Sequence, residues 1–221
     1  METALIIGAS GGIGCALSDR LKAQGVEVTS LSRSVNGFDL TKPDLTERML
    51  AELPGPFDLI IVASGALEIA GSEPEKSMRA VSARAMMDQF ALNAVGPALV
   101  LKHAHRLLPR DRRSVIAVLS ARVGSIGDNR LGGWVSYRAA KAAVNQIIHT
   151  AAIELARTHQ HTLCVALHPG TVKTAFTRKY LGRHPAVVPD EAAANLLSVV
   201  NGLSPADTGN FYDWAGKRVP W

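Results

Sequence analysis

Five short and almost unbroken apolar runs constrain the fold of this chain more than any other feature. They span residues 4–7, 26–30, 58–62, 115–119 and 163–167. Strands that are apolar on both sides need cover on both faces, as they have in a parallel sheet. Segments of helical character separate the runs, at 12–24, 45–53, 82–108, 134–157 and 189–201. The alternation predicts an α/β chain, a doubly wound parallel sheet with helices on both faces.

The length and the evenness of the sequence indicate one domain. No repeat, linker or low-complexity tract divides the 221 residues, so we expect 1–221 to fold as a single unit. The net charge of +5 is mild and spread along the chain. The one tight basic cluster, Arg110, Arg112 and Arg113, fits a solvated loop better than a nucleic-acid surface. We expect no nucleic-acid partner.

The remaining composition favours a cytoplasmic protein. No apolar run reaches the roughly 18 residues of a membrane span, and the first residues do not have the pattern of a signal peptide. Cys15 and Cys164 lie far apart, without the spacing of a disulfide framework or a metal site. We therefore expect two small core cysteines in a reducing compartment, no membrane partner and no bound metal.

A glycine-rich loop follows the first apolar run and leads directly into a helix. Glycines allow a tight turn and a close approach of the backbone to a pyrophosphate, while the helix N-terminus supplies N–H groups. Glycines also occur in ordinary turns, but this position after the first strand favours dinucleotide binding. The candidate binding residues are Gly8, Ser10, Gly11, Gly12, Ile13 and Gly14.

The end of the second run predicts which dinucleotide is bound. An acid near this position binds the ribose 2′-hydroxyl of NAD, but here Ser32 and Arg33 occupy it. A hydroxyl and a guanidinium would accept a 2′-phosphate, which favours NADP(H), with NAD(H) as the alternative. An exposed arginine in a turn is the structural alternative. Asp39 and Leu40 are candidates to flank the adenine ring.

Tyr137 and Lys141 are the candidate proton-transfer pair. Their i, i+4 spacing places both side chains on one face of a helix. The pKa of a free tyrosine is about 10, and a neighbouring ammonium favours the phenolate and lowers it. Such a pair can donate a proton to a carbonyl oxygen or accept one from an alcohol.

In order and spacing, these motifs resemble those of the short-chain dehydrogenase/reductase family, which has a Rossmann fold. The similarity runs from residue 3 to the C-terminus, and the segment from Gly124 to Tyr137 resembles more narrowly the C-factor-like branch, related to small carbonyl reductases. It implies an oxidoreductase that transfers hydride between a nicotinamide cofactor and a carbonyl or alcohol substrate. Tyr137 would be the general acid or base, and Lys141 would also bind the nicotinamide ribose.

The resemblance assigns further roles by position. Asn93 would hold a water in a proton relay. The structural alternative, a residue that kinks its helix and bonds to the backbone, is compatible with that role. The turns after two strands would border the cofactor, through Ser64 and Gly65, and through Pro169, Gly170, Val172 and Thr174. The segment 175–188 would shape the substrate pocket.

One family position departs from the pattern. The serine that polarises the substrate oxygen, at the end of the 115–119 strand, aligns with Ala121. Ser120 would face the opposite side unless the strand ends early or bulges, and Ser125 lies in the following loop. Three possibilities therefore stay open for the serine role: Ser120 fills it, Ser125 fills it, or neither does. The absent serine motivates a second hypothesis, a dinucleotide-sensing or signalling protein with weak or no catalysis.

Two helical stretches predict self-association. Neither 91–101 nor 142–153 contains an Asp, Glu, Lys or Arg, although the outer face of a helix in a monomer is usually polar. A deep core within the chain is the alternative explanation. We expect a homo-oligomer, a dimer or tetramer, formed through the helices near 91–108 and 134–157.

Overall fold

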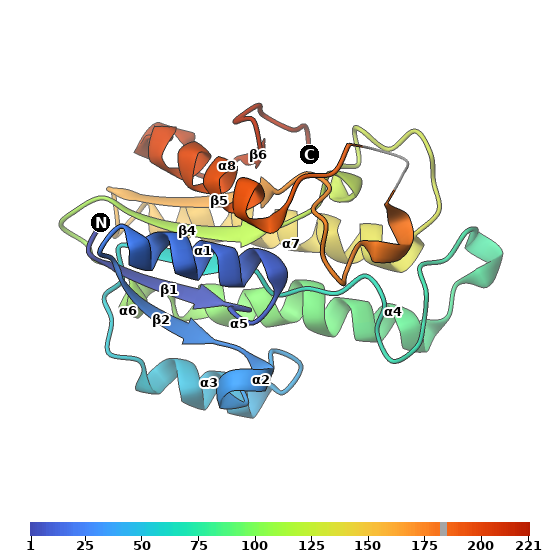
Figure 1. Cartoon of the computed structure of the whole chain (residues 1–221), viewed down its shortest axis with the longest axis horizontal. Coiled ribbons are helices and arrows are strands. Elements are labelled where there is room, and N and C mark those ends of the chain that lie inside the picture. The colour runs from blue at the N-terminus through green and yellow to red at the C-terminus, as the bar shows by residue number, and fades with distance from the viewer. Residues whose placement is uncertain (182–184) are drawn as a thin grey trace.

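A computed structural model describes residues 1–181 and 185–221 (Figure 1). Within these residues, six strands form one parallel sheet in the order β2-β1-β3-β4-β5-β6. The strands are β1 (Thr3–Ile7), β2 (Glu27–Leu31), β3 (Leu59–Val62), β4 (Ser114–Leu119), β5 (Thr162–His168) and β6 (Phe211–Asp213). The parallel sheet follows the five apolar runs, since β1, β3, β4 and most of β5 are buried on both faces.

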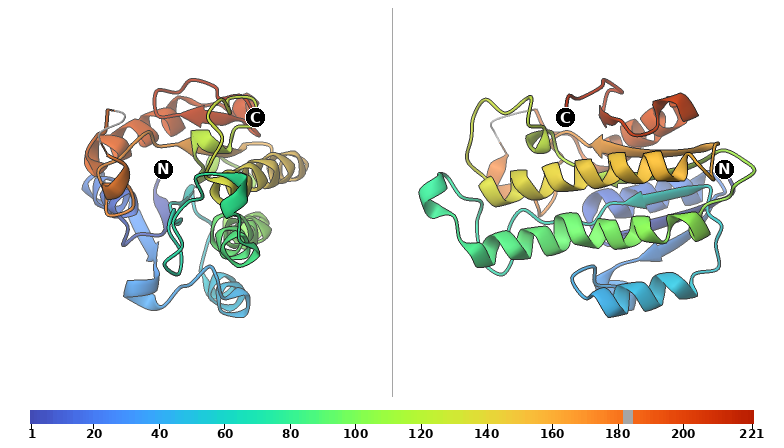
Figure 2. Two further views of the ribbon diagram at one scale, coloured as in Figure 1. Left: turned by 90° about the vertical axis from the view of Figure 1, so that its right-hand side faces the viewer. Right: turned by 180° about the vertical axis from the view of Figure 1, so that it is seen from behind.

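Helices cover both faces of the sheet, as Figures 1 and 2 show. One face carries α1 and α8, and the other carries α3, α5 and α7. The helices are α1 (Gly12–Ala23), α2 (Arg33–Asn36), α3 (Pro43–Glu52), α4 (Ala83–Phe90), α5 (Gly96–Lys102), α6 (Ala104–Leu107), α7 (Val135–Leu155) and α8 (Pro189–Gly202). The doubly wound fold predicted from the sequence is confirmed.

The prediction of one continuous helix over 82–108 is wrong, because the helical segment is interrupted twice. A π-helical turn, η2 (Ala91–Val95), separates α4 from α5, and His103 separates α5 from α6. Pro97 has no N–H to donate to the carbonyl of Asn93, and its ring would clash with that carbonyl in a regular helix. A widened turn before Pro97 relieves this conflict. The strand β6 was not predicted, since three residues are too few to show a periodic pattern.

The strands divide their side chains between two apolar cores. Ile116 and Val118 of β4 face α5 and α7, whereas Val115 and Ala117 face α1 and α8. Cys164 belongs to the first core.

The two cysteines differ, because Cys15 is exposed and its thiol donates to Asp19 at 3.6 Å. The expectation that both are core residues is therefore wrong for Cys15.

Two arginines of the basic cluster are tied into the fold. Arg112 pairs with Asp58 at 2.9 Å, and Arg113 donates to the carbonyls of Val200 and Leu203 at the end of α8. None of the described helices combines the length and the apolarity that crossing a bilayer requires.

Apolar side chains remain exposed on the helices for which self-association is expected. Val95 is 44% exposed, and Ile153 on α7 is 52% exposed. The homo-oligomer stays a prediction.

Candidate active site

The glycine loop turns between β1 and α1 at the carboxyl edge of the sheet. Gly8 has a φ of +89°, which side chains rarely adopt, and its carbonyl accepts from the Gly11 N–H at 3.0 Å. A Cβ at Gly14 would lie 2.2 Å from the Gly8 oxygen, so only glycine lets α1 approach this closely. Ser10, Gly11 and Gly12 are exposed, and no side chain caps α1. The first turn of α1 therefore presents N–H groups to an anion.

Two distant turns close against this loop. A Cβ at Gly8 would meet the backbone nitrogen of Ser64 at 2.7 Å, which places the turn after β3 directly beside it. A Cβ at Gly12 would lie 2.7 Å from Cγ2 of Thr174, so the segment after β5 reaches the same loop. Ile13 packs below, on the core shared by α1 and α8. The structure thus gathers three predicted elements of the cofactor site.

The turn after β5 carries Pro169 and Gly170, the latter with a φ of +77°. A Cβ at Gly170 would lie only 3.0 Å from Cδ1 of Trp214, which follows β6. Val172 is buried, and its carbonyl accepts a hydrogen bond from the Thr177 hydroxyl. Trp214 was not predicted as a site residue, because its place depends on the unrecognised strand β6.

Ser32 and Arg33 have different surroundings at the end of β2. Ser32 is buried, and its hydroxyl accepts from the Val35 N–H at 3.3 Å, which caps the short helix α2. Arg33 is exposed as the first residue of α2. Of the two, only Arg33 presents its polar group to solvent.

Asp39 and Leu40 are held by the chain itself. One carboxylate oxygen of Asp39 accepts from the Thr41 N–H at 2.9 Å and from its hydroxyl at 2.7 Å. Burial raises the pKa of Asp39, but these bonds and the charge of Arg33 outweigh it and lower the pKa. Leu40 is buried against Gly96, where a Cβ would lie 2.7 Å away. Leu40 is thus a core residue in this arrangement.

Tyr137 and Lys141 lie together in the first turns of α7, and both are almost fully buried. The Lys141 Nζ is 5.8 Å from the centre of the Tyr137 ring and donates to the Leu119 carbonyl at 2.9 Å. Burial raises the pKa of the Tyr137 phenol and lowers the pKa of Lys141 to about 8. The expected lowering of the Tyr137 pKa by Lys141 is therefore not found, because desolvation dominates and the amine bonds to Leu119.

Asn93 occupies the π-helical turn and is fully buried. Its Nδ2 donates to the Ala66 carbonyl at 3.0 Å and to Gln89 Oε1 at 2.7 Å. Among the described residues, its Oδ1 has no donor. A Cβ at Gly65 would lie 2.9 Å from this oxygen and 3.6 Å from the Nζ of Lys141. One small polar site is therefore bordered by Asn93, Gly65 and Lys141. Gln89, which accepts from Asn93, was not predicted as a site residue.

The two candidate serines are bonded elsewhere. Ser120 directly follows β4, and its N–H still donates to the Leu167 carbonyl of β5 at 2.8 Å. Its buried hydroxyl donates to Asn145 Oδ1 at 2.6 Å. Ser125 is 1% exposed, and its hydroxyl accepts from the Asp128 N–H at 3.1 Å. Within the described part of the chain, neither hydroxyl is bonded to Tyr137.

Aromatic side chains close over Tyr137. Trp134 and Phe176 each lie 6.4 Å from its ring, centre to centre. Tyr180 packs edge-on against Trp134 at 5.3 Å, and its hydroxyl donates to Glu68 at 3.1 Å. The segment after β5 is thereby joined to the loop after β3.

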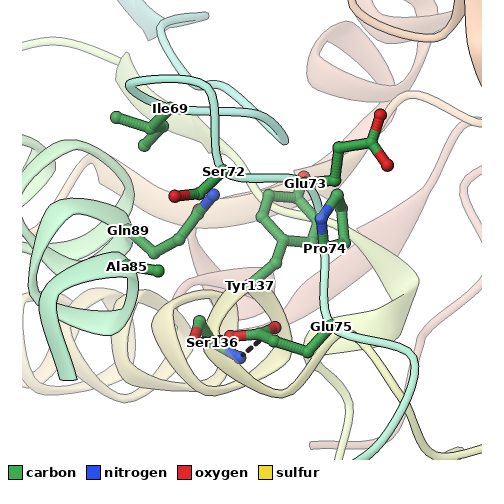
Figure 3. Close-up of a pocket in the computed structure, with 9 residues that line it drawn as sticks. All are labelled: Ile69, Ser72, Glu73, Pro74, Glu75, Ala85, Gln89, Ser136 and Tyr137. Atoms are coloured by element: carbon green, nitrogen blue, oxygen red, sulfur yellow. Dashed lines mark hydrogen bonds between the residues drawn. The ribbon is translucent and has the colours of Figure 1, made fainter. Parts of the chain in front are cut away.

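Two cavities border these side chains. One of about 240 Å³ lies between 66–68 and the segment containing Phe176, Arg178 and Lys179, the part of 175–188 that precedes the undescribed residues 182–184. The other, of about 10 Å³, lies against Tyr137 and has room for about one water (Figure 3). Glu75 lines it and bonds to Ser136, a contact without any sequence signal. Among the described residues, no three His, Cys, Asp or Glu side chains are grouped to hold a metal.

The chain matches known proteins over its full length. Residues 37–183 match the family model described as short chain dehydrogenase. A 1-hydroxy-2-glutathionyl-2-methyl-3-butene dehydrogenase from Rhodococcus is 28% identical over 100% of both chains. The C-signal protein of Myxococcus xanthus is 33% identical over 62% of this chain and 78% of its own length. This second match agrees with the narrower resemblance to the C-factor-like branch.

The fold also matches solved structures. A Burkholderia multivorans short-chain dehydrogenase/reductase with bound NADP superposes with a TM-score of 0.80, at 25% identity, over 100% of this chain and 99% of that chain. The family model covers well over half of the sequence, and the sheet order and the gathered motifs agree with it. The chain belongs to the short-chain dehydrogenase/reductase family of oxidoreductases.

Proposed function

We propose that this protein is an NADP(H)-dependent oxidoreductase that interconverts a carbonyl compound and its alcohol. The observation that carries the proposal is the buried pair Tyr137 and Lys141, with the Lys141 Nζ next to Gly65 in the turn after β3. Among the described tyrosines, Tyr137 is the one that has a lysine amine over its ring.

The residues present fit a dinucleotide. The exposed Gly11 and Gly12 and the uncapped start of α1 suit a pyrophosphate. Asn93 Oδ1 is buried without a donor beside Gly65 and Lys141, and a ribose hydroxyl or a water held by Asn93 would supply one. Pro169, Gly170, Val172 and Thr174 would border the nicotinamide, which supplies the hydride when bound.

The preference for NADP(H) rests on Arg33. Its guanidinium is exposed at the start of α2, whereas the Ser32 hydroxyl already caps that helix. A guanidinium binds a phosphate through charge-assisted hydrogen bonds. The Burkholderia multivorans relative holds NADP, which supports the same preference here.

Tyr137 acts as the acid in the reducing direction. Burial holds its phenol protonated, so the O–H is available to a carbonyl oxygen as hydride reaches the carbonyl carbon. The C–O π electrons take the phenol proton, and the alcohol leaves a tyrosinate behind. The Lys141 amine lies 5.8 Å from the ring centre, so its ammonium form places a positive charge near that anion in a buried setting. Asn93 would hold the water through which the proton is restored.

A binding or sensing role is the second candidate. Ala121 stands at the position of the family serine, and the Ser120 and Ser125 hydroxyls are bonded within the protein. The C-signal relative carries a name connected with signalling. Such a protein would bind the dinucleotide without rapid turnover.

A panel of aldehydes and ketones with NADPH and NADH separates the two roles. We expect NADPH oxidation that depends on the carbonyl compound and exceeds the rate with NADH. Tight NADPH binding without turnover of any compound, in either direction, would favour the sensing role instead.

A further inference from the structure

A buried carboxylate from a distant loop caps the helix that carries Tyr137. Glu75 is 7% exposed, and its side chain accepts from the Ser136 N–H at 3.1 Å and from the Ser136 hydroxyl. Its carbonyl accepts from the Trp134 N–H at 2.5 Å. Figure 3 shows the carboxylate beside the first turn of α7, with both side-chain bonds drawn. Glu75 thus accepts three hydrogen bonds from two residues, Trp134 and Ser136, that lie just before Tyr137 in the chain.

The sequence of α7 does not provide this cap itself. Trp134 stands at the N-cap with a φ of +52°, and its side chain makes no capping bond. A bulky residue in this left-handed conformation is strained and persists only where its surroundings hold it. The contacts of Glu75 to Trp134 and Ser136 supply that support. They also satisfy N–H groups that the first turn would otherwise leave unpaired.

Glu75 binds as an anion. Burial raises the pKa of its carboxyl group, but the bonds from the Ser136 hydroxyl and from backbone amides outweigh burial and hold the pKa below its ordinary value. The described residues place no cationic side chain in a salt bridge with Glu75. The positive end of the α7 dipole provides the compensating field.

Tyr137 has little freedom in this arrangement. Its ring lies between the 72–75 segment and Gln89 in Figure 3, with Trp134 and Phe176 packed around it. The cavity shared by Glu75 and Tyr137 measures only about 10 Å³. A shift of the first turn of α7 would therefore move the phenol directly.

We propose that Glu75 is a positioning residue. Its side chain is long enough to bond to Ser136, and this contact holds the phenol of Tyr137 in place for proton transfer. The inference rests on the proposed function, since it assigns a role toward the same reaction. Misplacement by about 1 Å through a residue outside the reacting groups can reduce a rate about 10²-fold.

Three substitutions of Glu75 distinguish the effect of its side-chain length from the effect of its negative charge. Glu75→Gln keeps the length and an oxygen that accepts the Ser136 N–H, whereas Glu75→Asp keeps the charge but is one methylene shorter. Glu75→Ala removes both. We expect kcat to fall about 10- to 100-fold in the Asp and Ala variants, with KM changed less than about 3-fold, and to stay within about 3-fold of wild type in the Gln variant. Glu52→Ala, at the exposed end of α3, is the matched control.

A measurement without substrate gives an independent readout. The chain has three tyrosines, so ¹³Cζ-tyrosine NMR gives few signals, and Tyr137→Phe assigns one of them. We expect the Tyr137 signal to shift or broaden in Glu75→Asp and Glu75→Ala, but not in Glu75→Gln. The Tyr212 signal, from β6, should stay in place and report an intact fold.

The outcomes are distinct. Wild-type kcat and an unmoved Tyr137 signal in Glu75→Asp would overturn the positioning role, as would a loss in Glu75→Gln as large as that in Glu75→Asp. If Glu75→Ala does not fold, the Gln and Asp variants still decide. Full activity of Tyr137→Phe would instead refute the proposed function, whatever Glu75 does.

Discussion

Replacing Lys141 by methionine should make the protein more stable while removing its activity. Lys141 is 3% exposed, and burial lowers its pKa from 10.5 to about 8. At 1.36 kcal/mol per pH unit, holding this ammonium in the folded protein costs about 3 kcal/mol near pH 7. Loss of the bond to the Leu119 carbonyl offsets about half of that cost. The expected net gain is therefore about 1.5 kcal/mol, by which the wild type is less stable because it keeps this lysine in the site.

The pH dependence is a sharper signature than the gain itself. Between about pH 8 and about pH 10.5 the unfolded chain binds more protons at Lys141 than the folded chain, so wild-type stability rises with pH in this window. The rise at this residue should amount to about 2 kcal/mol between about pH 7.5 and about pH 9.5. Methionine does not titrate, so the variant should lack this component. Tyr137 acts in the opposite sense at higher pH, because burial raises its pKa.

Urea unfolding of cofactor-free protein at several pH values measures both effects. The advantage of Lys141→Met over wild type in unfolding free energy should disappear and then reverse as pH rises to about 9.5. Lys22→Met, on the exposed side of α1, controls for the introduction of a methionine and should change stability by less than about 0.5 kcal/mol. A difference that stays constant with pH, or a variant destabilised by more than about 1 kcal/mol at pH 7, would refute the assignment of a desolvated lysine.

Two further variants test neighbouring parts of the site. Ser120→Ala should lower the unfolding free energy by about 1 to 3 kcal/mol in urea titrations, because Asn145 Oδ1 loses its buried donor. Its kcat should stay within about 10-fold of wild type, and a larger loss would show that the hydroxyl turns toward substrate. Arg33→Ala should weaken NADPH binding about 10-fold or more in calorimetry and leave NADH binding unchanged. Equal losses for both cofactors would contradict a 2′-phosphate contact.

The fold was predictable because its signals are local. Apolar runs mark strands covered on both faces, and the glycine loop marks the first strand-to-helix turn whatever lies elsewhere. The interruption before Pro97 and the strand β6 were missed for opposite reasons. The first depends on one missing N–H within an otherwise helical pattern, and the second has no pattern long enough to detect.

The sequence was sufficient to predict which residues form the site, but not the hydrogen bonds that they make. The sequence located Tyr137, Lys141 and Asn93, yet it could not show that Lys141 bonds to Leu119 or that desolvation governs both pKa values. Glu75 carried no sequence signal, because a carboxylate 61 positions before Ser136 reads as an ordinary surface charge until the fold brings the two together. Contacts between distant loops are set by tertiary packing rather than by local pattern.

The most direct test of the central claim compares wild type with Tyr137→Phe for NADPH binding and for carbonyl reduction. The substitution removes only the hydroxyl from a buried ring, so NADPH affinity should change less than about 3-fold while kcat falls at least about 10²-fold, the range for loss of a general acid. A Tyr137→Phe variant that binds NADPH and reduces the carbonyl compound at the wild-type rate would contradict the account.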